Sequence, residues 1–482
     1  EIDSSDGELY SMLKELGNFS AELYFSLKTP TKQDVERFCY NYSALPDRYD
    51  EGVVLYRNAF SIASFDGEKD WLGLNQRSRK SPAAATHPTG AWRVRANQLS
   101  GKVEIDKKEN YQLAEALRHE LHQHPELSYH ETWTKQHLMD FLKEHTSLEL
   151  HDGGKYFYAV YRAPSDCAAA GDKKAIAFRA DFDALPIEDE IDKPWKSCVP
   201  GVGHKCGHDG HAAALCGLGL ELMDMKPDRD VYMVFQHAEE TGQGAVEAQQ
   251  FIKDNPDIGE IYAFHNRPGE ELGQIRISNT VANCASKGMS VYMKGTPTHA
   301  SIPENGINPV FALTEIVRAI PEFTDPDAYE GLVLCTIVQL DVGDYAFGIA
   351  ASEGVLRMTI RAEIEAEMDL LQKKIEDLAK AEAEKYGLQL KFEFEDVFPE
   401  TRNDPHCVEK VHKAAEKLGY SVVESIASRG SEDFGYYTKL IPGAIYYIGG
   451  GVDKPSFHTS GFDFTDSIIE NAVEMFKALI EE

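Results

Sequence analysis

The 482-residue sequence has no apolar run close to the roughly 18 residues that a membrane-spanning helix requires. Its opening residues also lack a signal-peptide core between a basic start and a small-residue cleavage site. We therefore expect no membrane partner and a cytoplasmic location. Because the chain begins at Glu1, a removed leader stays open, and the sequons at Asn18 and Asn41 leave a secreted or organellar location as the alternative.

Basic residues are scarce: 49 Lys and Arg stand against 80 Asp and Glu, giving a formal net charge of -31. With this charge nothing would offset repulsion from phosphate, which argues against nucleic acid or an anionic membrane surface as a partner. The eight cysteines are dispersed without a repeated spacing, unlike the dense framework of a small disulfide-stapled protein. Reduced thiols in an intracellular compartment are the simpler interpretation.

The hydrophobic fraction of 42% is ordinary for a globular protein, and the chain is too long for one core, so we expect two or three domains. Residues 1–105 differ from the rest. They are rich in Tyr, Phe and Ser and end in the loop-like stretch "RSRKSPAAATHPTGAWRVRANQLSG". They contain no catalytic constellation, and we treat them as an N-terminal extension of unknown fold.

Short apolar runs of strand length alternate with helical patterns over residues 106–282 and again over 398–482. The strand-like runs are "KKAIAFRA", "DVYMVFQ", "EIYAFH" and "GAIYYIGG". Helical stretches lie between them, as at 211–225 and 243–254. Strands that alternate with helices predict an α/β catalytic domain with a mixed, largely parallel sheet covered by helices.

Residues 283–397 follow a different order. Strand, helix, strand, strand, long charged helix and strand succeed one another, beginning with "KGMSVYMKG" and ending with "LQLKFEFEDV". This βαββαβ order is that of a ferredoxin-like domain. We expect an inserted domain here, which splits the catalytic domain into two segments of sequence.

The stretch "HKCGHDGH" begins at residue 204 and runs into an apolar helix. Cys206 and His208 are separated by one glycine, so both side chains can turn toward one ion, and thiolate with imidazole suits zinc and similar ions. The alternative is a histidine-rich turn that caps the helix, with Asp209 or the backbone as the cap. Alone, the motif does not decide between them.

Polar clusters also follow four predicted strands, where open α/β sheets build their sites. They are Arg179, Asp181 and Asp183; His237, Glu239 and Glu240; His265; and His458. Each has a structural alternative, because a Glu pair is usually a solvated face and a lone His is usually hydrogen-bonded in a turn. Together with the Cys206 and His208 motif they make five clusters, which favour one shared site.

The stretches "RHELHQHPELSYHE", "FRADFDALPIEDE", "HKCGHDGHAAAL", "VFQHAEETGQGA", "FHNRPG", "KGTPTHASIPENGINP", "RGSEDFGYY" and "FHTSGFDF" stand in that order along the chain. In order and spacing they resemble the M20 metallopeptidase family. Within it they are similar to the amidohydrolase branch, which includes hippurate hydrolases, N-acyl-amino-acid amidohydrolases, indole-acetyl-amino-acid hydrolases and aminobenzoyl-glutamate hydrolases. The resemblance covers residues 108–482.

The resemblance implies two divalent metal ions, zinc or manganese, in each subunit. The implied ligands are Cys206, His208, Glu240, His265 and His458. It also implies Glu239 as general base and Asp183 as the group that orients part of the metal site. Asp181 stands where many relatives outside this branch have a metal-binding histidine, so its role stays open.

His299, in "GTPTHAS" of the predicted insert, corresponds to a histidine that reaches the active site of the partner subunit and stabilises the oxyanion. The resemblance thus implies a homodimer through the insert, with His299 as a catalytic and substrate-binding residue. A surface histidine in a Gly-Thr-Pro turn is the alternative.

The substrate contacts are less well defined. Many relatives have an asparagine in a glycine-containing turn of the insert, but the stretch "VGDYAFGIAASEG" has none. Arg361 is a candidate for binding a substrate carboxylate through its guanidinium fork, or else a structural ion pair. The resemblance implies that Glu432 and Asp433 lie near the pocket, where metal-binding histidines need such partners. The structural interpretation, which does not exclude this, is a capped helix start with Ser431 as the N-cap.

The sequence therefore predicts a metal-dependent amidohydrolase that cleaves N-acyl or N-aroyl amino acids through a metal-bound hydroxide, with Glu239 as general base. A dipeptidase or carboxypeptidase acting on short peptides needs the same metal core. A protein of a different functional class, a catalytically inactive scaffold that kept the fold, is the other alternative. Such a scaffold would not need Glu239 as a free base beside the metal ligand Glu240. His204, Asp209 and His211 are expected to support the turn without binding the ions.

Overall fold

The computed structural model describes residues 21–25, 53–57, 104–164 and 174–482. The chain divides into two compact units, Glu1–Asn110 and Tyr111–Glu482. In the first unit, strands β1 (Ala21–Phe25) and β2 (Val53–Arg57) pair antiparallel. The predicted linker before residue 102 and both sequons lie outside the described residues.

The larger unit contains an eight-stranded mixed sheet in the order β17-β8-β18-β7-β5-β6-β4-β3. Its strands are β3 (Glu149–Asp152), β4 (Phe157–Tyr161), β5 (Ala175–Asp181), β6 (Val231–Gln236), β7 (Ile258–Pro268), β8 (Ile275–Ile277), β17 (Val422–Glu424) and β18 (Gly443–Gly451). The four central strands, β18, β7, β5 and β6, are parallel, and antiparallel pairs flank them. The predicted α/β class with a largely parallel centre is confirmed.

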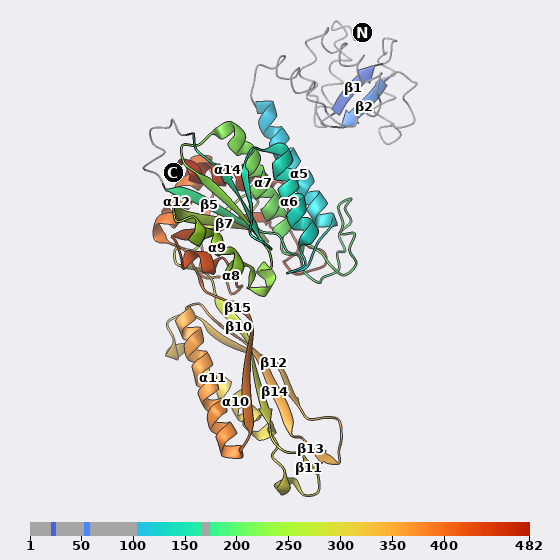
Figure 1. Cartoon of the computed structure of the whole chain (residues 1–482), viewed down its shortest axis with the longest axis vertical. Coiled ribbons are helices and arrows are strands. Elements are labelled where there is room, and N and C mark those ends of the chain that lie inside the picture. The colour runs from blue at the N-terminus through green and yellow to red at the C-terminus, as the bar shows by residue number, and fades with distance from the viewer. Residues whose placement is uncertain (1–20, 26–52, 58–103, 165–173) are drawn as a thin grey trace. The chain divides into compact units, whose positions relative to one another are not determined.

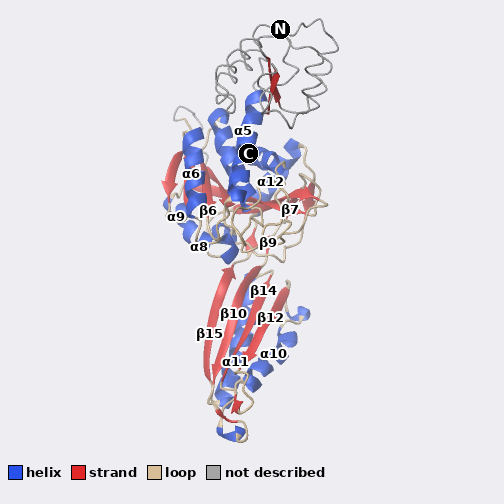
Figure 2. Cartoon of the chain, turned by 90° about the vertical axis from the view of Figure 1, so that its right-hand side faces the viewer, coloured by secondary structure: helices blue, strands red, loops and turns tan. Residues whose placement is uncertain are grey.

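Helices cover both faces of this sheet (Figure 2). One face carries α5 (Glu104–Gln123), α6 (Thr132–His145), α7 (His208–Met225), α12 (Pro405–Leu418) and α14 (Ile468–Glu481); the other carries α8 (Gly244–Ala248), α9 (Gln250–Asp254) and α13 (Gly435–Thr438). Because successive strand residues point to opposite faces, Phe178 of β5 joins the first core and Ala177 joins the second. Every residue of β5 is buried, as expected for a strand covered on both faces.

Between β9 (Val281–Asn283) and β16 (Thr401–Arg402) the chain forms a separate four-stranded antiparallel sheet (Figure 1). Its main elements are β10 (Ala285–Lys294), α10 (Val310–Phe323), β12 (Val333–Val342), β14 (Glu353–Ala362), α11 (Glu365–Tyr386) and β15 (Gln389–Phe398). The smaller ones are β11 (Thr298–His299), η5 (Pro303–Asn305), η6 (Pro326–Ala328) and β13 (Ile349–Ala350). The strand order β12-β14-β10-β15 with this βαββαβ connectivity is ferredoxin-like.

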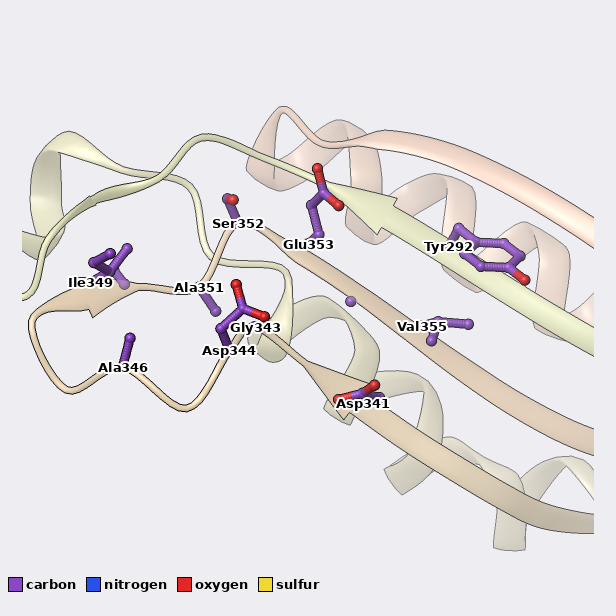
Figure 3. Close-up of a pocket in the computed structure, with 12 residues that line it drawn as sticks. Tyr292, Asp341, Gly343, Asp344, Ala346, Ile349, Ala351, Ser352, Glu353 and Val355 are labelled. Atoms are coloured by element: carbon purple, nitrogen blue, oxygen red, sulfur yellow. The ribbon is translucent and has the colours of Figure 1, made fainter.

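The insert has its own apolar core. Met289, Val291 and Met293 alternate along β10 and pack against α10 and α11, which both lie on one face of the sheet (Figure 2). A hollow of about 510 Å³ opens at the far end of this sheet, near β13 (Figure 3). No predicted site residue lines it. The hollow is therefore separate from the predicted metal site.

Local boundaries differ from the sequence analysis in two places. The helix predicted over 243–254 is two short helices, α8 and α9, because the backbone turns at Gln249. The helix predicted from 211 begins at His208, so a candidate ligand lies in its first turn. Among the described residues, no helix is both long and apolar enough to cross a bilayer. The six described cysteines are free thiols, and Cys39 and Cys167 lie outside the described residues.

Candidate metal centre

The parallel centre of the large sheet brings distant segments together. Because the carboxyl ends of β5, β6, β7 and β18 face the same edge, the residues that follow these strands meet there. The loop after β5 holds Asp183, the turn after β6 holds Glu239 and Glu240, and the loop after β18 holds His458. His265 lies within β7, which extends three residues beyond it.

The five predicted ligands are neighbours at this edge. The Cys206 Sγ atom lies 3.5 Å from His265 Nε2, and His458 Nε2 lies 3.6 Å from Glu240 Oε1. Their potential ligand atoms form two groups within 4.8 Å, one of Cys206, His208 and His265 and one of Cys206, Glu240 and His458. Cys206 belongs to both groups.

The free ring nitrogen of His208 is surrounded by acids. Its Nε2 atom lies 3.8 Å from an oxygen of Asp181, 3.9 Å from Glu239 and 3.8 Å from Glu240. Buried His208 Nε2 and Glu240 Oε1 have no hydrogen-bond partner in the described part of the chain. Buried polar atoms are normally paired, so these two atoms suit a site that takes up a further partner such as a metal ion.

Hydrogen bonds on the far side of each ring fix the orientation of the histidines. Asp183 accepts a bond from His208 Nδ1 at 3.0 Å, and the Asn266 carbonyl accepts one from His265 Nδ1 at 2.8 Å. Asp183 also accepts bonds from the Ser128 hydroxyl and the Glu240 backbone N–H. Both Nε2 atoms are thereby left as lone-pair donors.

The backbone is constrained on three sides of the site. Gly207, between Cys206 and His208, has a φ of 106°, and a Cβ atom there would lie 2.4 Å from Asn266 Oδ1. Ala238 and His458 also have positive φ, of 48° and 57°. Non-glycine residues in this region are strained, and such strain concentrates at functional sites.

Glu239 is 6% exposed and lies over a buried charge cluster. Arg179 contacts Asp181, Glu432 and Asp433 at 2.6, 3.1 and 2.7 Å. Burial, with Glu432 and Asp433 nearby, raises the pKa of Glu239 well above its usual value. Burial also raises the pKa of Glu240 to about 7. The site thus contains more carboxylates than cations, which favours an added positive charge.

Asp181 has less freedom than the predicted ligands. It contacts Arg179 and lies 2.6 Å from His211 Nδ1, while His211 Nε2 lies 2.8 Å from Asn266 Oδ1. These bonds hold the first turn of α7 against β5 and β7. His211 takes part in this arrangement through both ring nitrogens, and its predicted role as a supporting residue that binds no ion stays a prediction.

Arg361 lies on β14 and donates hydrogen bonds to the Arg429 carbonyl and the Ser431 hydroxyl. It forms no ion pair within the described residues. The predicted N-cap role of Ser431 is wrong. The next helix, α13, begins at Gly435, and the Ser431 hydroxyl contacts Ser286 and the Cys284 carbonyl.

His299 is not part of the cluster within one chain. It is exposed on β11, and its Nδ1 atom lies 2.7 Å from the Ser301 hydroxyl. The ten residues of β10 span about 30 Å and separate this end of the insert from the large sheet. His299 therefore stays a prediction that depends on a second subunit.

Sequence reasoning did not identify a second buried network beside the ligands. It includes Arg118, His122, Asp189, Lys205 and Asp209, all at most 1% exposed. The signal was present in "RHELHQHPE", where Arg118 and His122 are four residues apart and share one face of a helix.

The sequence model described as peptidase family M20/M25/M40 matches residues 177–482. The chain belongs to this family. A solved Bacillus subtilis structure, described as a dinuclear metal binding peptidase from the M20 family, is 25% identical with a TM-score of 0.65. The match covers 77% of this chain and 98% of that one. The chain is accordingly a hydrolase of the M20 family.

Curated relatives that are matched over nearly their whole length have named activities. An N-acetylcysteine deacetylase from Bacillus subtilis is 27% identical over 75% of this chain and 94% of the relative. An N-acetyldiaminopimelate deacetylase from Listeria monocytogenes is 29% identical over 76% of this chain and 98% of the relative.

Proposed function

We propose that this M20 hydrolase is a metal-dependent amidohydrolase that cleaves an N-acyl or N-aroyl amino acid into a carboxylic acid and a free amino acid. One observation carries the proposal: buried His208 Nε2 and Glu240 Oε1 have no hydrogen-bond partner among the described residues, and they face a site in which Glu239 is a further buried carboxylate. A set of lone-pair donors with a free acid beside it suits hydrolysis at a metal centre.

The residues fit two divalent ions. Cys206, His208, Glu240, His265 and His458 would hold them, with Cys206 near both groups of donors. Thiolate, imidazole and carboxylate donors suit zinc, and manganese accepts the nitrogen and oxygen donors. The hydrogen bonds of Asp183 and of the Asn266 carbonyl keep the histidine rings oriented for this purpose.

The chemistry divides between the ions and the protein. When bound, two ions would lower the pKa of a water toward about 7 and polarise the amide carbonyl. Glu239 accepts the proton of the attacking water at its carboxylate and then donates it to the leaving amine nitrogen. The raised pKa of Glu239, caused first by burial, suits a group that must hold a proton between these steps.

The substrate class follows the relatives. The named deacetylases remove acetyl groups from amino acids, and the sequence motifs resemble the same branch. Arg361 and Glu432 remain proposed substrate contacts. For Arg361 to bind a substrate carboxylate, its hydrogen bond to the Ser431 hydroxyl must be replaced by a hydrogen bond to the substrate.

We also propose that the working unit is a homodimer formed through the insert. β12 is an edge strand of ten residues that pairs with β14 alone among the described strands, and Ile337, Val338 and Leu340 are exposed on it. A long apolar edge is normally covered, and a second copy would cover it. His299 would then stabilise the oxyanion in the partner's site.

The alternatives are a dipeptidase or carboxypeptidase, which shares the metal core, and an inactive scaffold. A hydrolysis screen over acyl, aroyl and peptidyl amino acids, with metal analysis of the same sample, separates the three. Release of free amino acid from N-acyl substrates is expected. Cleavage of peptides alone favours the peptidase, and bound metal without turnover favours the scaffold. The sequence prediction of a cytoplasmic location stays to be tested by fractionation.

A further inference from the structure

A buried network connects α5 to the loop that carries Cys206 and His208. The imidazole of His122 lies between two carboxylates, with Nδ1 2.7 Å from Asp209 Oδ2 and Nε2 3.1 Å from Asp189 Oδ2. Carboxylates only accept hydrogen bonds, so the ring can donate to both of them, and Arg118 Nη2 lies 3.4 Å from the same Nδ1 atom. All three side chains are at most 1% exposed.

The two carboxylates hold the residues on either side of the ligand pair Cys206 and His208. Asp209 directly follows His208 and also lies 3.0 Å from Arg118 Nε. Asp189 bonds the ammonium group of Lys205, which directly precedes Cys206. His122 therefore connects the residue before the ligand pair, through Asp189, to the residue after it.

The same network supports a third proposed ligand. The Lys205 carbonyl accepts the backbone N–H of His458 at 2.8 Å, and the Lys205 ammonium donates to the Phe462 carbonyl at 2.9 Å. His458 has a positive φ, so its position depends on such neighbours. Three of the five proposed ligands are thus held through Lys205 and Asp209.

We propose that His122 is a positioning residue of the metal centre, which sets the spacing of Cys206, His208 and His458 by bridging Asp189 and Asp209. The inference rests on the proposed function, because it assumes that these ligands bind metal. His122 contacts none of the ligand side chains, so it acts through the backbone segment 205–209. The role differs from that of Asp183, which bonds a ligand ring directly.

The test compares three variants at His122 with one control. His122→Asn keeps a donor near the position of Nδ1, His122→Gln keeps one near that of Nε2, and His122→Ala keeps neither. The control is His124→Ala, just past the end of α5, where the side chain is exposed and its ring contacts the Glu120 carbonyl. Zn²⁺ affinity is measured by chelator competition, with folding followed by circular dichroism.

The inference predicts that Zn²⁺ binds about 10–100-fold more weakly to His122→Ala than to the wild-type protein, a loss typical of residues that orient ligands. Turnover at saturating Zn²⁺ should fall far less than Zn²⁺ affinity, because Glu239 is unchanged. The Asn and Gln variants should show intermediate losses of Zn²⁺ affinity. They replace His122→Ala in the comparison if that variant does not fold. His124→Ala should bind Zn²⁺ as the wild type does.

Unchanged Zn²⁺ affinity in folded His122 variants, even with a lower melting temperature, would overturn the inference and leave His122 as a core residue. Failure of the proposed function gives a different result, seen in the wild-type protein before any variant is compared. The wild type would then bind no Zn²⁺ at this site, or would bind Zn²⁺ without releasing amino acids from N-acyl substrates.

Discussion

The Nδ1 atom of His208 lies 3.0 Å from Oδ1 of Asp183, and the opposite nitrogen of the same ring has no hydrogen-bond partner in the described part of the chain. One carboxylate thus fixes the tautomer and the direction of a buried imidazole. Its second oxygen accepts the backbone N–H of Glu240. Asp183 therefore aligns two proposed ligands, one in the first turn of α7 and one in the turn after β6, while leaving their donor atoms free.

Asp183→Asn should weaken metal binding by about 10–100-fold, because the amide can offer only one acceptor oxygen to His208 and Glu240. Isothermal titration with Zn²⁺ or Mn²⁺ measures the loss. Exposed Asp453→Asn is the matched control and should bind as the wild type does. Equal metal affinities of the two variants would show that Asp183 does not orient the metal ligands.

Glu239→Gln should retain its metal and lose turnover by about 10²–10⁴-fold, since the amide cannot accept or return a proton. Metal content and the rate of amino-acid release are measured on the same preparation. Turnover within a few fold of the wild-type rate would contradict the role of Glu239 as general base.

His299→Ala should dimerise normally and lose activity, and mixing tests whether the histidine acts across subunits. His299→Ala and Glu239→Gln homodimers are each expected to be inactive. In a mixed dimer, the subunit with Glu239 receives His299 from its partner, so one intact site forms. Random exchange should restore about a quarter of the wild-type activity. No recovery, with exchange confirmed by mass, would place His299 outside the partner's site.

The His122 network should make stability depend on pH. Burial lowers the pKa of His122, but the charge of Asp209 and the hydrogen bonds to Asp189 and Asp209 outweigh it, so the pKa is raised. Below the unfolded pKa of about 6.5 the stabilisation is fully present, and it is lost as the pH rises through the raised folded pKa. The gap in unfolding free energy between metal-free wild type and His122→Gln should therefore shrink above about pH 6.5. Denaturant titrations at several pH values measure it, and a gap that widens would contradict this sign.

The strands and the shared site were predictable because their signals are local. β5, β6, β7 and β18 are short apolar runs, and in a parallel sheet their carboxyl ends must face one edge. Spacing alone then brings Asp183, Glu239, Glu240 and His265 together. The βαββαβ order of the insert was predictable in the same way, because each strand and helix has its own local pattern of apolar residues.

The supporting contacts were not predictable, because they join residues far apart in sequence. Arg361 meets the Ser431 hydroxyl across 70 positions, and His122 meets Asp209 across 87. Periodicity identifies which face of a helix is buried but not which polar group it meets. The N-cap prediction for Ser431 failed for this reason, since its hydroxyl pairs with β10 instead of the next helix.

The central claim is that two metal ions lie at the carboxyl edge of the large sheet. An anomalous difference map from Zn²⁺-loaded crystals tests it most directly. The account predicts two peaks about 3.5–4 Å apart among Cys206, His208, Glu240, His265 and His458. An empty site there, or peaks only at the separate surface group of Glu115, His119 and Asp466, would contradict it.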